Sequence, residues 1–274
     1  MEPRETLLYL SLKYQGDVLK MIDAIHARED FDNDEAEAEI AKIHCPYVTV
    51  LDPEYPQALI ETHCYPLVLF YRGNLSLVND HMKCVTIVGS RACTEYGKEA
   101  TTNIASELAR RGYTVVSGLA RGIDTAANRG ALPYGKSVAV LGNGIDYYYP
   151  SENSALQRDI GTMGLLLSEY PPTLAPSPES FPRRNRILAG LSGATILGGA
   201  SGHSGTLITA AYALNYNRDL GCIPYRIGEE DSAGNAWIKT GASLIENADD
   251  VELMLSGTGH NSVKAFPQKS FEDL

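Results

Sequence analysis

Six short apolar runs, separated by helical patterns, dominate the sequence between residues 84 and 225. Each run is nearly continuous and rich in Val, Ile and Leu, which is typical of strands buried on both faces of a sheet. Strands that alternate with helices form parallel βαβ units. We therefore predict an α/β fold, an open Rossmann-like parallel sheet with helices on both faces. The predicted strands cover residues 84–90, 113–118, 137–142, 164–170, 194–199 and 220–225.

The clearest helical pattern covers residues 94–112. Thr94 can accept a hydrogen bond from the free amides of the first turn, and Ile104 and Leu108 share one face. Gly112 stands where many helices end in the left-handed conformation. These features predict one long helix between the first two strands.

The residues before the sheet have a different pattern. Helical spacing over residues 1–45 predicts a small helical domain, in which the acidic run 30–40 is a solvated helix face or a linker. Residues 47–74 predict a strand, a Pro-containing turn, a short helix and a second strand. The predicted domains are the small helical domain (1–45), the extended Rossmann-like domain (46–255) and a C-terminal tail (256–274).

The sequence lacks the signals of a membrane or secreted protein. No apolar run reaches membrane-span length, and the first residues do not form a signal peptide. The five cysteines are scattered without a C-x-x-C pair, as expected of reduced thiols. The pairs His44-Cys45 and His63-Cys64 lack the short ligand spacing of a zinc site. We expect a cytoplasmic protein without a membrane segment, a metal or a cofactor.

Charge is unevenly distributed along the chain. Residues 81–220 carry 13 basic and 10 acidic side chains, residues 1–80 carry 6 and 15, and residues 221–274 carry 4 and 9. The whole chain has a net charge of −11. An anionic ligand is therefore expected to bind the middle of the chain rather than either end.

Glycines follow several of the predicted strands. Ligands of an open α/β sheet bind at the carboxyl ends of its strands, where glycine allows close approach and helix N-termini offer free amides. Four such Gly-containing turns follow the predicted strands, and two of them also carry an arginine. Together the four turns favour phosphate binding. A G-x-G-x-x-G motif with its partner acid and a P-loop lysine are both missing, so a dinucleotide or P-loop site is disfavoured. The turns contain Gly89-Ser90-Arg91, Gly118 to Asp124, "GNGIDYYYPSEN" and "GGASGHSGTLIT".

The segment "SFPRRNRILAG" (180–190) concentrates positive charge at a predicted helix start. Cations there oppose the helix dipole, and a bound anion would remove the conflict. The alternative is that arginines of this cluster pair with Glu169, Glu179 or another acid. The three arginines are Arg183, Arg184 and Arg186.

Aromatic residues near these segments, such as Phe181, Tyr96 and the run 147–149, suggest base stacking beside phosphate-binding arginines. Partial burial at the sheet edge is the alternative for two of the three tyrosines in that run. A catalytic set is not evident, because the serines after the strands lack a histidine base. Asp124, at a predicted helix start, is first a candidate N-cap residue.

Six ordered motifs resemble the DprA/Smf (DNA-processing protein A) family over residues 46–253. The resemblance implies a bacterial, non-enzymatic protein that binds single-stranded DNA, protects the incoming strand during natural transformation, dimerises and loads the RecA recombinase. The motifs are "VGSR", "VSGLARGIDTAA", "GNGIDYYYPSEN", "FPRRNRILAGLS", "SGTLIT" and "GASLIENADDV".

The resemblance also implies a DNA-binding pocket. It maps onto Gly89, Ser90, Arg91, Ser117, Gly118, Arg121, Tyr149, Pro150, Asn153, Phe181, Arg184, Asn185, Arg186, Ser204 and Gly205.

Two segments depart from the family pattern. Gly198-Gly199-Ala200 and His203 stand where many members have Val-Glu-Ala and a basic residue, and Pro224-Tyr225-Arg226 stands where many have Pro-Gly. The first departure bears on the charge of the pocket, and the second on a surface for a dimer or a partner.

Two other functions remain open. "GGASGHSGT" is superficially similar to the loop of nucleoside-monophosphate phosphoribohydrolases, although the glutamate expected three residues after Gly-Thr is missing. A nucleotide-sensing module without a DNA function is the second alternative.

Overall fold

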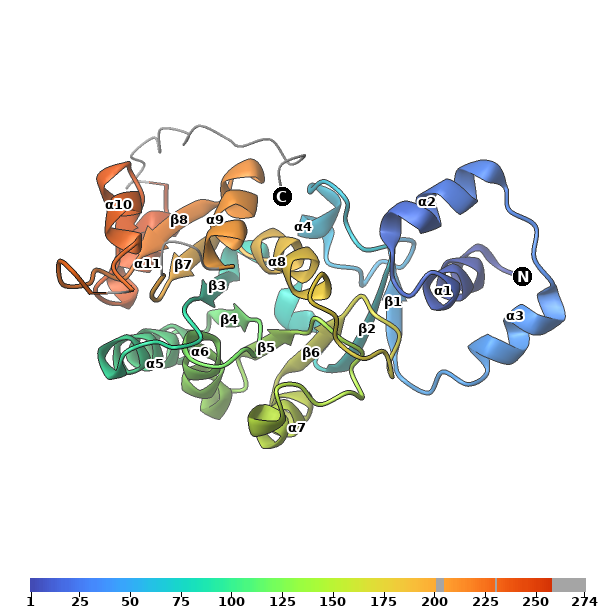
Figure 1. The fold of residues 1–274 in the computed structure, drawn as a ribbon, viewed down its shortest axis with the longest axis horizontal. Helices are drawn as coiled ribbons and strands as arrows, with labels where there is room; N and C mark the ends of the chain where they lie inside the picture. Colours follow the sequence, from blue (N-terminus) through green and yellow to red (C-terminus); the bar gives the residue numbers. More distant parts are fainter. Residues whose placement is uncertain (201–204, 230, 258–274) are drawn as a thin grey trace.

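One sheet organises the computed structural model, which describes residues 1–200, 205–229 and 231–257. Within these residues the sheet has nine strands in the order β1-β2-β6-β5-β4-β3-β7-β8-β9 (Figure 1). The strands are β1 (Tyr47–Thr49), β2 (Val68–Gly73), β3 (Cys84–Val88), β4 (Thr114–Ser117), β5 (Ser137–Val140), β6 (Leu165–Ser168), β7 (Ala194–Leu197), β8 (Asp219–Cys222) and β9 (Ser243–Leu244).

The strands from β3 to β9 run parallel, so the predicted parallel sheet is confirmed. The segment 47–74 also has the predicted strand–helix–strand order. Its two strands add an antiparallel edge, because β2 pairs with β6 and β1 pairs with β2. The sequence did not predict this pairing or the two-residue strand β9.

Helices cover both faces of the sheet. Thr94 caps α5 by accepting a hydrogen bond from the Gly97 amide at 3.1 Å, and Gly112 has a φ of +92°, both as predicted. The helices are α1 (Pro3–Lys13), α2 (Val18–Ala27), α3 (Asn33–Ile40), α4 (Gln57–Ile60), α5 (Glu95–Arg110), α6 (Ile123–Ala131), α7 (Ser154–Met163), α8 (Ser180–Gly190), α9 (Thr206–Asn215), α10 (Gly234–Lys239) and α11 (Ala248–Leu255).

Alternate residues of the strands feed different cores, as expected of a sheet with two covered faces. In β5, Val138 and Val140 belong to a core that includes Leu188 of α8 and Ala210 of α9. Ala139 belongs to another core with Leu8 of α1.

The N-terminal helices pack directly on the sheet. Leu8 and Met21 share a core with Val68 and Phe70 of β2. Figure 1 shows α1, α2 and α3 grouped at the end of the molecule beside β1 and β2. The acidic run forms α3, in which Ala36 is the buried residue, so the solvated helix face is confirmed. The domain boundary at residue 45 stays a prediction.

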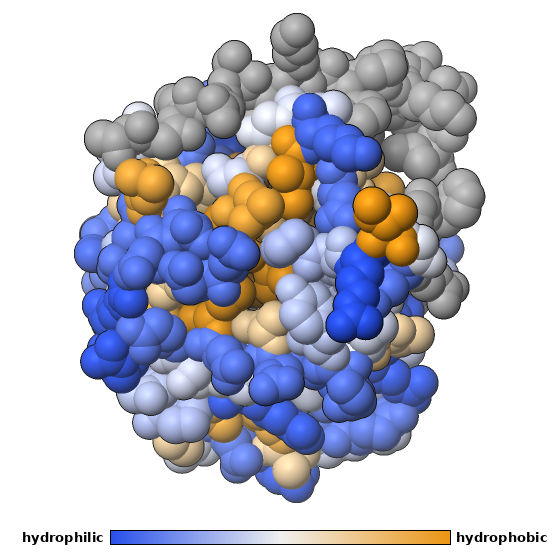
Figure 2. All heavy atoms as spheres, turned by 90° about the vertical axis from the view of Figure 1, so that its left-hand side faces the viewer, coloured by the Kyte–Doolittle hydropathy of each residue, from blue (hydrophilic) through white to orange (hydrophobic). Residues whose placement is uncertain are grey.

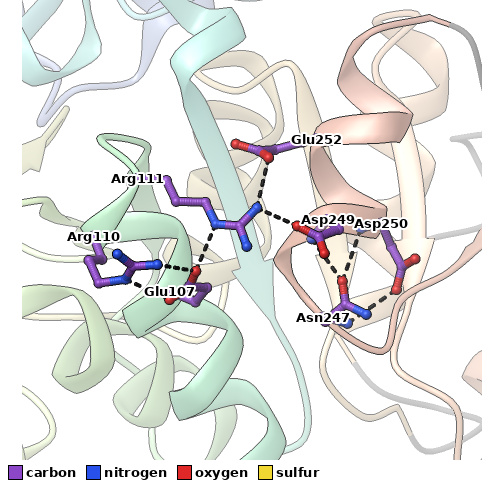
Figure 3. Close-up of polar contacts among 7 residues, drawn as sticks. All are labelled: Glu107, Arg110, Arg111, Asn247, Asp249, Asp250 and Glu252. Carbon is purple, nitrogen blue, oxygen red and sulfur yellow. Dashed lines mark hydrogen bonds and ion pairs between the residues drawn. The ribbon is translucent and has the colours of Figure 1, made fainter.

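At the other end, α11 is fastened to α5 through one arginine. Arg111, at the C-terminal end of α5, donates hydrogen bonds to Asp249 at 2.6 Å and Glu252 at 2.8 Å (Figure 3). It also pairs with Glu107 of its own helix at 2.8 Å. Asn247 caps α11 by accepting bonds from the amides of its first turn. The network joins two helices that are far apart in the sequence.

The structure also shows the state of the cysteines. The five cysteines are free thiols, three of them buried. In the ranges that the structure describes, no His, Cys, Asp and Glu side chains gather to hold a metal ion. No helix of these ranges combines the length and the apolar character that a bilayer crossing requires.

Candidate nucleic-acid interface

The strand order reverses at β3, which lies between β4 and β7. The chain leaves β3 toward α5 and leaves β7 toward α9, so the carboxyl ends of the two strands open a crevice between them. A cleft of about 790 Å³ lies at this point. It is lined by Val88, Gly89, Ser90, Arg91, Ala92, Ala120, Asp124, Tyr149, Pro176, Ser177, Pro178, Phe181, Pro182, Arg184, Asn185, Gly205, Thr206 and Thr209.

Asp124 acts as an internal anion in the wall of this cleft. Its buried carboxylate accepts hydrogen bonds from the amides of Gly89 at 3.3 Å and Gly118 at 3.1 Å. These amides end β3 and β4, where an external anion would otherwise be expected. Gly122 is the N-cap of α6, so the prediction that Asp124 caps this helix is wrong. Burial raises the pKa of Asp124, while Arg184 and the amides act to lower it.

Arg184 lies on the inner side of the same wall and is only 4% exposed. Its guanidinium donates hydrogen bonds to the carbonyl of Gly118, at 2.7 Å, and to that of Val140. Burial lowers the pKa of Arg184, and the attraction of Asp124 opposes that shift. Arg184 therefore ties the ends of β4 and β5 together as well as lining the cleft.

Gly118 is required by this arrangement. A Cβ atom at this position would lie 2.5 Å from Nη2 of Arg184 and 2.6 Å from its central carbon. Such contacts are far inside van der Waals distance, so any side chain would displace the guanidinium. The glycine serves internal packing as well as the approach of a ligand.

The other two arginines of α8 are held by carboxylates of the protein. Arg186 forms a buried ion pair with Glu169, and Arg183 pairs with Asp17 at 2.8 Å. Internal acids therefore offset the positive charge at the start of α8, as in the ion-pair alternative. The expectation that a bound ligand is needed to offset the whole cluster is wrong. Arg186 does not line the cleft.

Arg91 is the accessible guanidinium of the cleft. The residue is exposed and forms no ion pair with the described residues. Its guanidinium lies 5.6 Å from the centroid of the Phe181 ring, within the range of a cation–π contact. A cation held in this way can meet an anionic ligand without first breaking an ion pair.

Phe181 and Tyr149 place aromatic surface beside this cation. Their ring centroids are 5.4 Å apart. The Phe181 ring packs over Gly142, where a Cβ atom would come within 2.7 Å of the ring. Ser180 anchors the start of α8 by donating a hydrogen bond to the Gly142 carbonyl. The end of β5 therefore determines where the ring lies.

A smaller hollow of about 100 Å³ adjoins the cleft at the ends of β4 and β5. Arg91, Ala120, Tyr149, Phe181 and Arg184 line both. The smaller hollow adds Gly118, Leu119, Arg121, Leu141, Gly142, Asn143 and Pro150.

Most of the predicted pocket residues are brought together. Those that line the main cleft are Gly89, Ser90, Arg91, Tyr149, Phe181, Arg184, Asn185 and Gly205. Those that line only the smaller hollow are Gly118, Arg121 and Pro150. Those that line neither are Ser117, Asn153 and Arg186. Ser204 and His203 lie outside the described residues.

Ser117 and Asn153 are buried with partners of their own. The Ser117 hydroxyl donates a hydrogen bond to the Ile87 carbonyl at 2.7 Å, which ties β4 to β3. The Asn153 amide donates to the Leu119 carbonyl at 2.9 Å and to the Thr125 hydroxyl at 2.8 Å. Both side chains shape the loop after β4 from behind.

The sequence prediction did not include several lining residues. Pro176, Ser177 and Pro178 form one rim of the cleft, and Thr206 and Thr209 come from α9. The sequence signal for this rim was the Pro-rich loop after β6, which carries the chain across the edge of the sheet to α8. The signal for the two threonines was the motif "SGTLIT", which contains both.

The two departures from the family pattern meet in space. Tyr225 follows β8, is buried, and donates a hydrogen bond from its hydroxyl to the Gly198 carbonyl at 2.7 Å. A Cβ atom at Gly199 would lie 2.6 Å from this hydroxyl oxygen, and one at Gly97 would lie 2.0 Å from it. The Tyr225 hydroxyl therefore occupies space that side chains at Gly97 and Gly199 would need.

Comparison with known proteins agrees with this geometry. The model of the family described as DNA recombination-mediator protein A matches residues 46–256. DNA processing protein DprA of Streptococcus pneumoniae is 42% identical over 208 residues, which are 75% of this chain and 73% of that protein. The chain spans about half the length of two other curated relatives, 51% and 53%.

Two solved structures share the fold. An X-ray structure of DNA processing protein A from Streptococcus pneumoniae aligns with a TM-score of 0.76 at 34% identity, over 90% of this chain and 95% of that one. A structure of DNA processing protein A from Helicobacter pylori, described for its single-stranded DNA binding mode, aligns with a TM-score of 0.70 at 32% identity. The alignment covers 79% of this chain and 99% of that one. The chain therefore belongs to the DNA recombination-mediator protein A family, as its ordered motifs predicted.

Proposed function

We propose that this chain binds single-stranded DNA in the cleft at the carboxyl ends of β3 and β4. In this proposal it protects the incoming strand during natural transformation and loads RecA onto it. Arg91 contacts a phosphate, and an unpaired base lies against Phe181 and Tyr149. Ser117, Asn153 and Arg186 support the walls of the site from behind.

The observation that carries the proposal is the position of Arg91. It is an exposed guanidinium without an ion partner in the described residues, and it lies beside an aromatic pair in the largest cleft described above. Phosphate-binding cations next to stacking rings are the usual components of single-strand recognition. Unstacked bases are available in single strands and are not available in a duplex.

Binding without catalysis fits the carboxylates of the site. Asp124 is engaged by two backbone amides and is close to Arg184, so it is not placed to accept a proton from a substrate. Thr209 stands where a phosphoribohydrolase would need its glutamate, and it is buried. These observations disfavour the enzyme alternative.

A homodimer is part of the proposal. Figure 2 shows hydrophobic residues exposed between hydrophilic ones on the side of the molecule where α5 and α11 lie. Ile227, after β8, is fully exposed, and Leu253 of α11 is 55% exposed. A second copy would remove this apolar surface from water.

The test is calorimetric titration with an oligothymidylate and with thymidine monophosphate. We expect the oligomer to bind much more tightly, because a strand fills the cleft and also reaches neighbouring surface. Arg91→Ala should lose about 1–3 kcal/mol of binding free energy, as for one charge-assisted contact. Arg129→Ala, an exposed arginine near the end of α6, is the matched control. Equal affinity for monomer and oligomer would favour the nucleotide-sensing alternative.

A further inference from the structure

Tyr148 and Arg158 form a second aromatic–cation pair just outside the cleft. The Arg158 guanidinium of α7 lies 5.6 Å from the centroid of the Tyr148 ring. Tyr148 is 38% exposed, and Arg158 is also exposed. This pair repeats the composition of the Arg91–Phe181 pair inside the cleft. Tyr148 belongs to the motif "GNGIDYYYPSEN", but neither residue is among the pocket residues that the resemblance implies.

The two pairs are adjacent in the chain through Tyr149. Tyr149 lines the cleft and contacts the Phe181 ring, and Tyr148 is its neighbour in the chain. Consecutive Cα atoms are about 3.8 Å apart. Tyr148 is therefore within reach of a strand that leaves the cleft past Tyr149.

The backbone that carries these rings is held firmly. The Tyr147 carbonyl accepts hydrogen bonds from the Asn143 amide at 2.7 Å and from the Gln157 amide at 3.2 Å. Both amide side chains are buried. Because the backbone is fixed from inside, the exposed rings need little further ordering when a ligand binds them.

The local charge leaves Arg158 available. Asp146 is paired with Arg72 at 2.6 Å, and Glu152 is paired with Arg121. Asp159 is the neighbour of Arg158 in the chain and is exposed. In the part of the chain that the structure describes, Arg158 itself makes no ion pair. Asp146 and Glu152 are thus paired elsewhere, and Arg158 remains beside the ring with Asp159 as its acidic neighbour in the chain.

We propose that Tyr148 and Arg158 are an extension site for the same single strand. A base beyond those in the cleft stacks on Tyr148, and Arg158 contacts a phosphate next to it. The inference rests on the proposed single-stranded DNA binding and assigns a second, separate contact. Stacking on a tyrosine accepts any base, so the site adds affinity without sequence preference.

The experiment measures affinity for oligothymidylates of increasing length by fluorescence anisotropy, for the full chain and for Tyr148→Ala. Short oligomers that fill only the cleft should bind both proteins equally. Longer oligomers should bind Tyr148→Ala about tenfold more weakly, which equals about 1.4 kcal/mol and is in the range of one stacked base. Arg158→Ala should lower the steepness of the salt dependence for long oligomers by about 0.7, the loss of one phosphate contact.

Tyr134→Ala is the matched control. Tyr134 is similarly exposed, but it precedes the amino end of β5, whereas the cleft lies at the carboxyl ends of the strands. Equal affinity of wild type and Tyr148→Ala at every length would overturn the extension site while leaving binding in the cleft intact. An equal loss at every length would place Tyr148 within the cleft contact and also overturn it. Failure of the wild type to bind any length would overturn both proposals.

Discussion

At the scale of single residues, the charges in and behind the cleft fall into two groups. Asp124, Arg184 and Arg186 are buried, and each meets a partner inside the protein. Arg91 is exposed beside Phe181. Buried charges of the first group maintain the shape of the cleft, because each would be costly to leave without its partner. Arg91 is free to contribute directly to affinity.

Arg184→Ala should destabilise the fold rather than simply weaken binding. The substitution leaves the buried carbonyls of Gly118 and Val140 without this donor, which costs about 1–3 kcal/mol for each unsatisfied group, and it removes the attraction between Arg184 and Asp124. Urea unfolding measures the free energy of unfolding of the wild type, of Arg184→Ala and of a double variant that combines Arg184→Met with Asp124→Asn. We expect the double variant to recover part of the lost stability, since the two charges are removed together. An Arg184→Ala protein of wild-type stability with lost DNA binding would instead assign Arg184 a direct phosphate contact.

At the scale of elements, Arg111 makes α11 dependent on α5. Arg110 and Arg111 together lower the pKa of Glu107 to about 2 from an ordinary value of 4.5. A carboxylate with a lowered folded-state pKa stabilises the fold above its unfolded pKa, and that contribution is lost as the pH falls toward the folded value. The network of Figure 3 should therefore weaken between about pH 4.5 and about pH 2.

Glu107→Gln tests this dependence by thermal unfolding across the acidic range. The difference in Tm from the wild type should be largest above about pH 4.5 and should shrink as the pH approaches 2. Glu99→Gln, an exposed position on the same helix, is the control. A difference that does not change with pH would show that Glu107 acts through packing rather than charge.

Tyr225 couples the segment after β8 to α5. Gly97→Ala places a methyl group in the space of the Tyr225 hydroxyl, and overpacking of this kind costs about 1–3 kcal/mol. The same substitution in a Tyr225→Phe protein should cost less, because the closest oxygen is gone. Chemical unfolding of the four proteins in a double-mutant cycle measures the coupling. Additive losses would mean that the two residues do not share this space.

Elements with strong local signals were predictable from the sequence. The apolar runs of β3 to β8 and the capped helix α5 appear where their patterns placed them. The antiparallel edge was not predictable, because the pairing of β2 with β6 depends on contacts across nearly a hundred residues. The sequence offered Glu169 as a partner for the arginine cluster, and Arg186 has this partner. The hydrogen bonds of Asp124 were not predictable, since they depend on which side of the turn its side chain faces.

At the scale of the whole molecule, acidic segments precede and follow the part of the sequence that forms most of the cleft, and Arg91 in the cleft has no ion partner among the described residues. The net charge of −11 disfavours nonspecific attraction to the dense charge of a duplex. Under the proposed function, binding has to come from a local site, in which an exposed arginine and aromatic rings would meet an unpaired strand. We therefore expect selectivity for single strands.

The most direct test is fluorescence anisotropy of a labelled oligothymidylate at several salt concentrations, with the matched duplex as competitor. We predict binding that the duplex does not displace. The logarithm of affinity should fall with the logarithm of salt concentration with a slope of roughly −1.4, as for the two proposed phosphate contacts of Arg91 and Arg158 on a single strand. No binding at low salt, or binding that the duplex displaces equally well, would contradict the assignment of the cleft to single-stranded DNA.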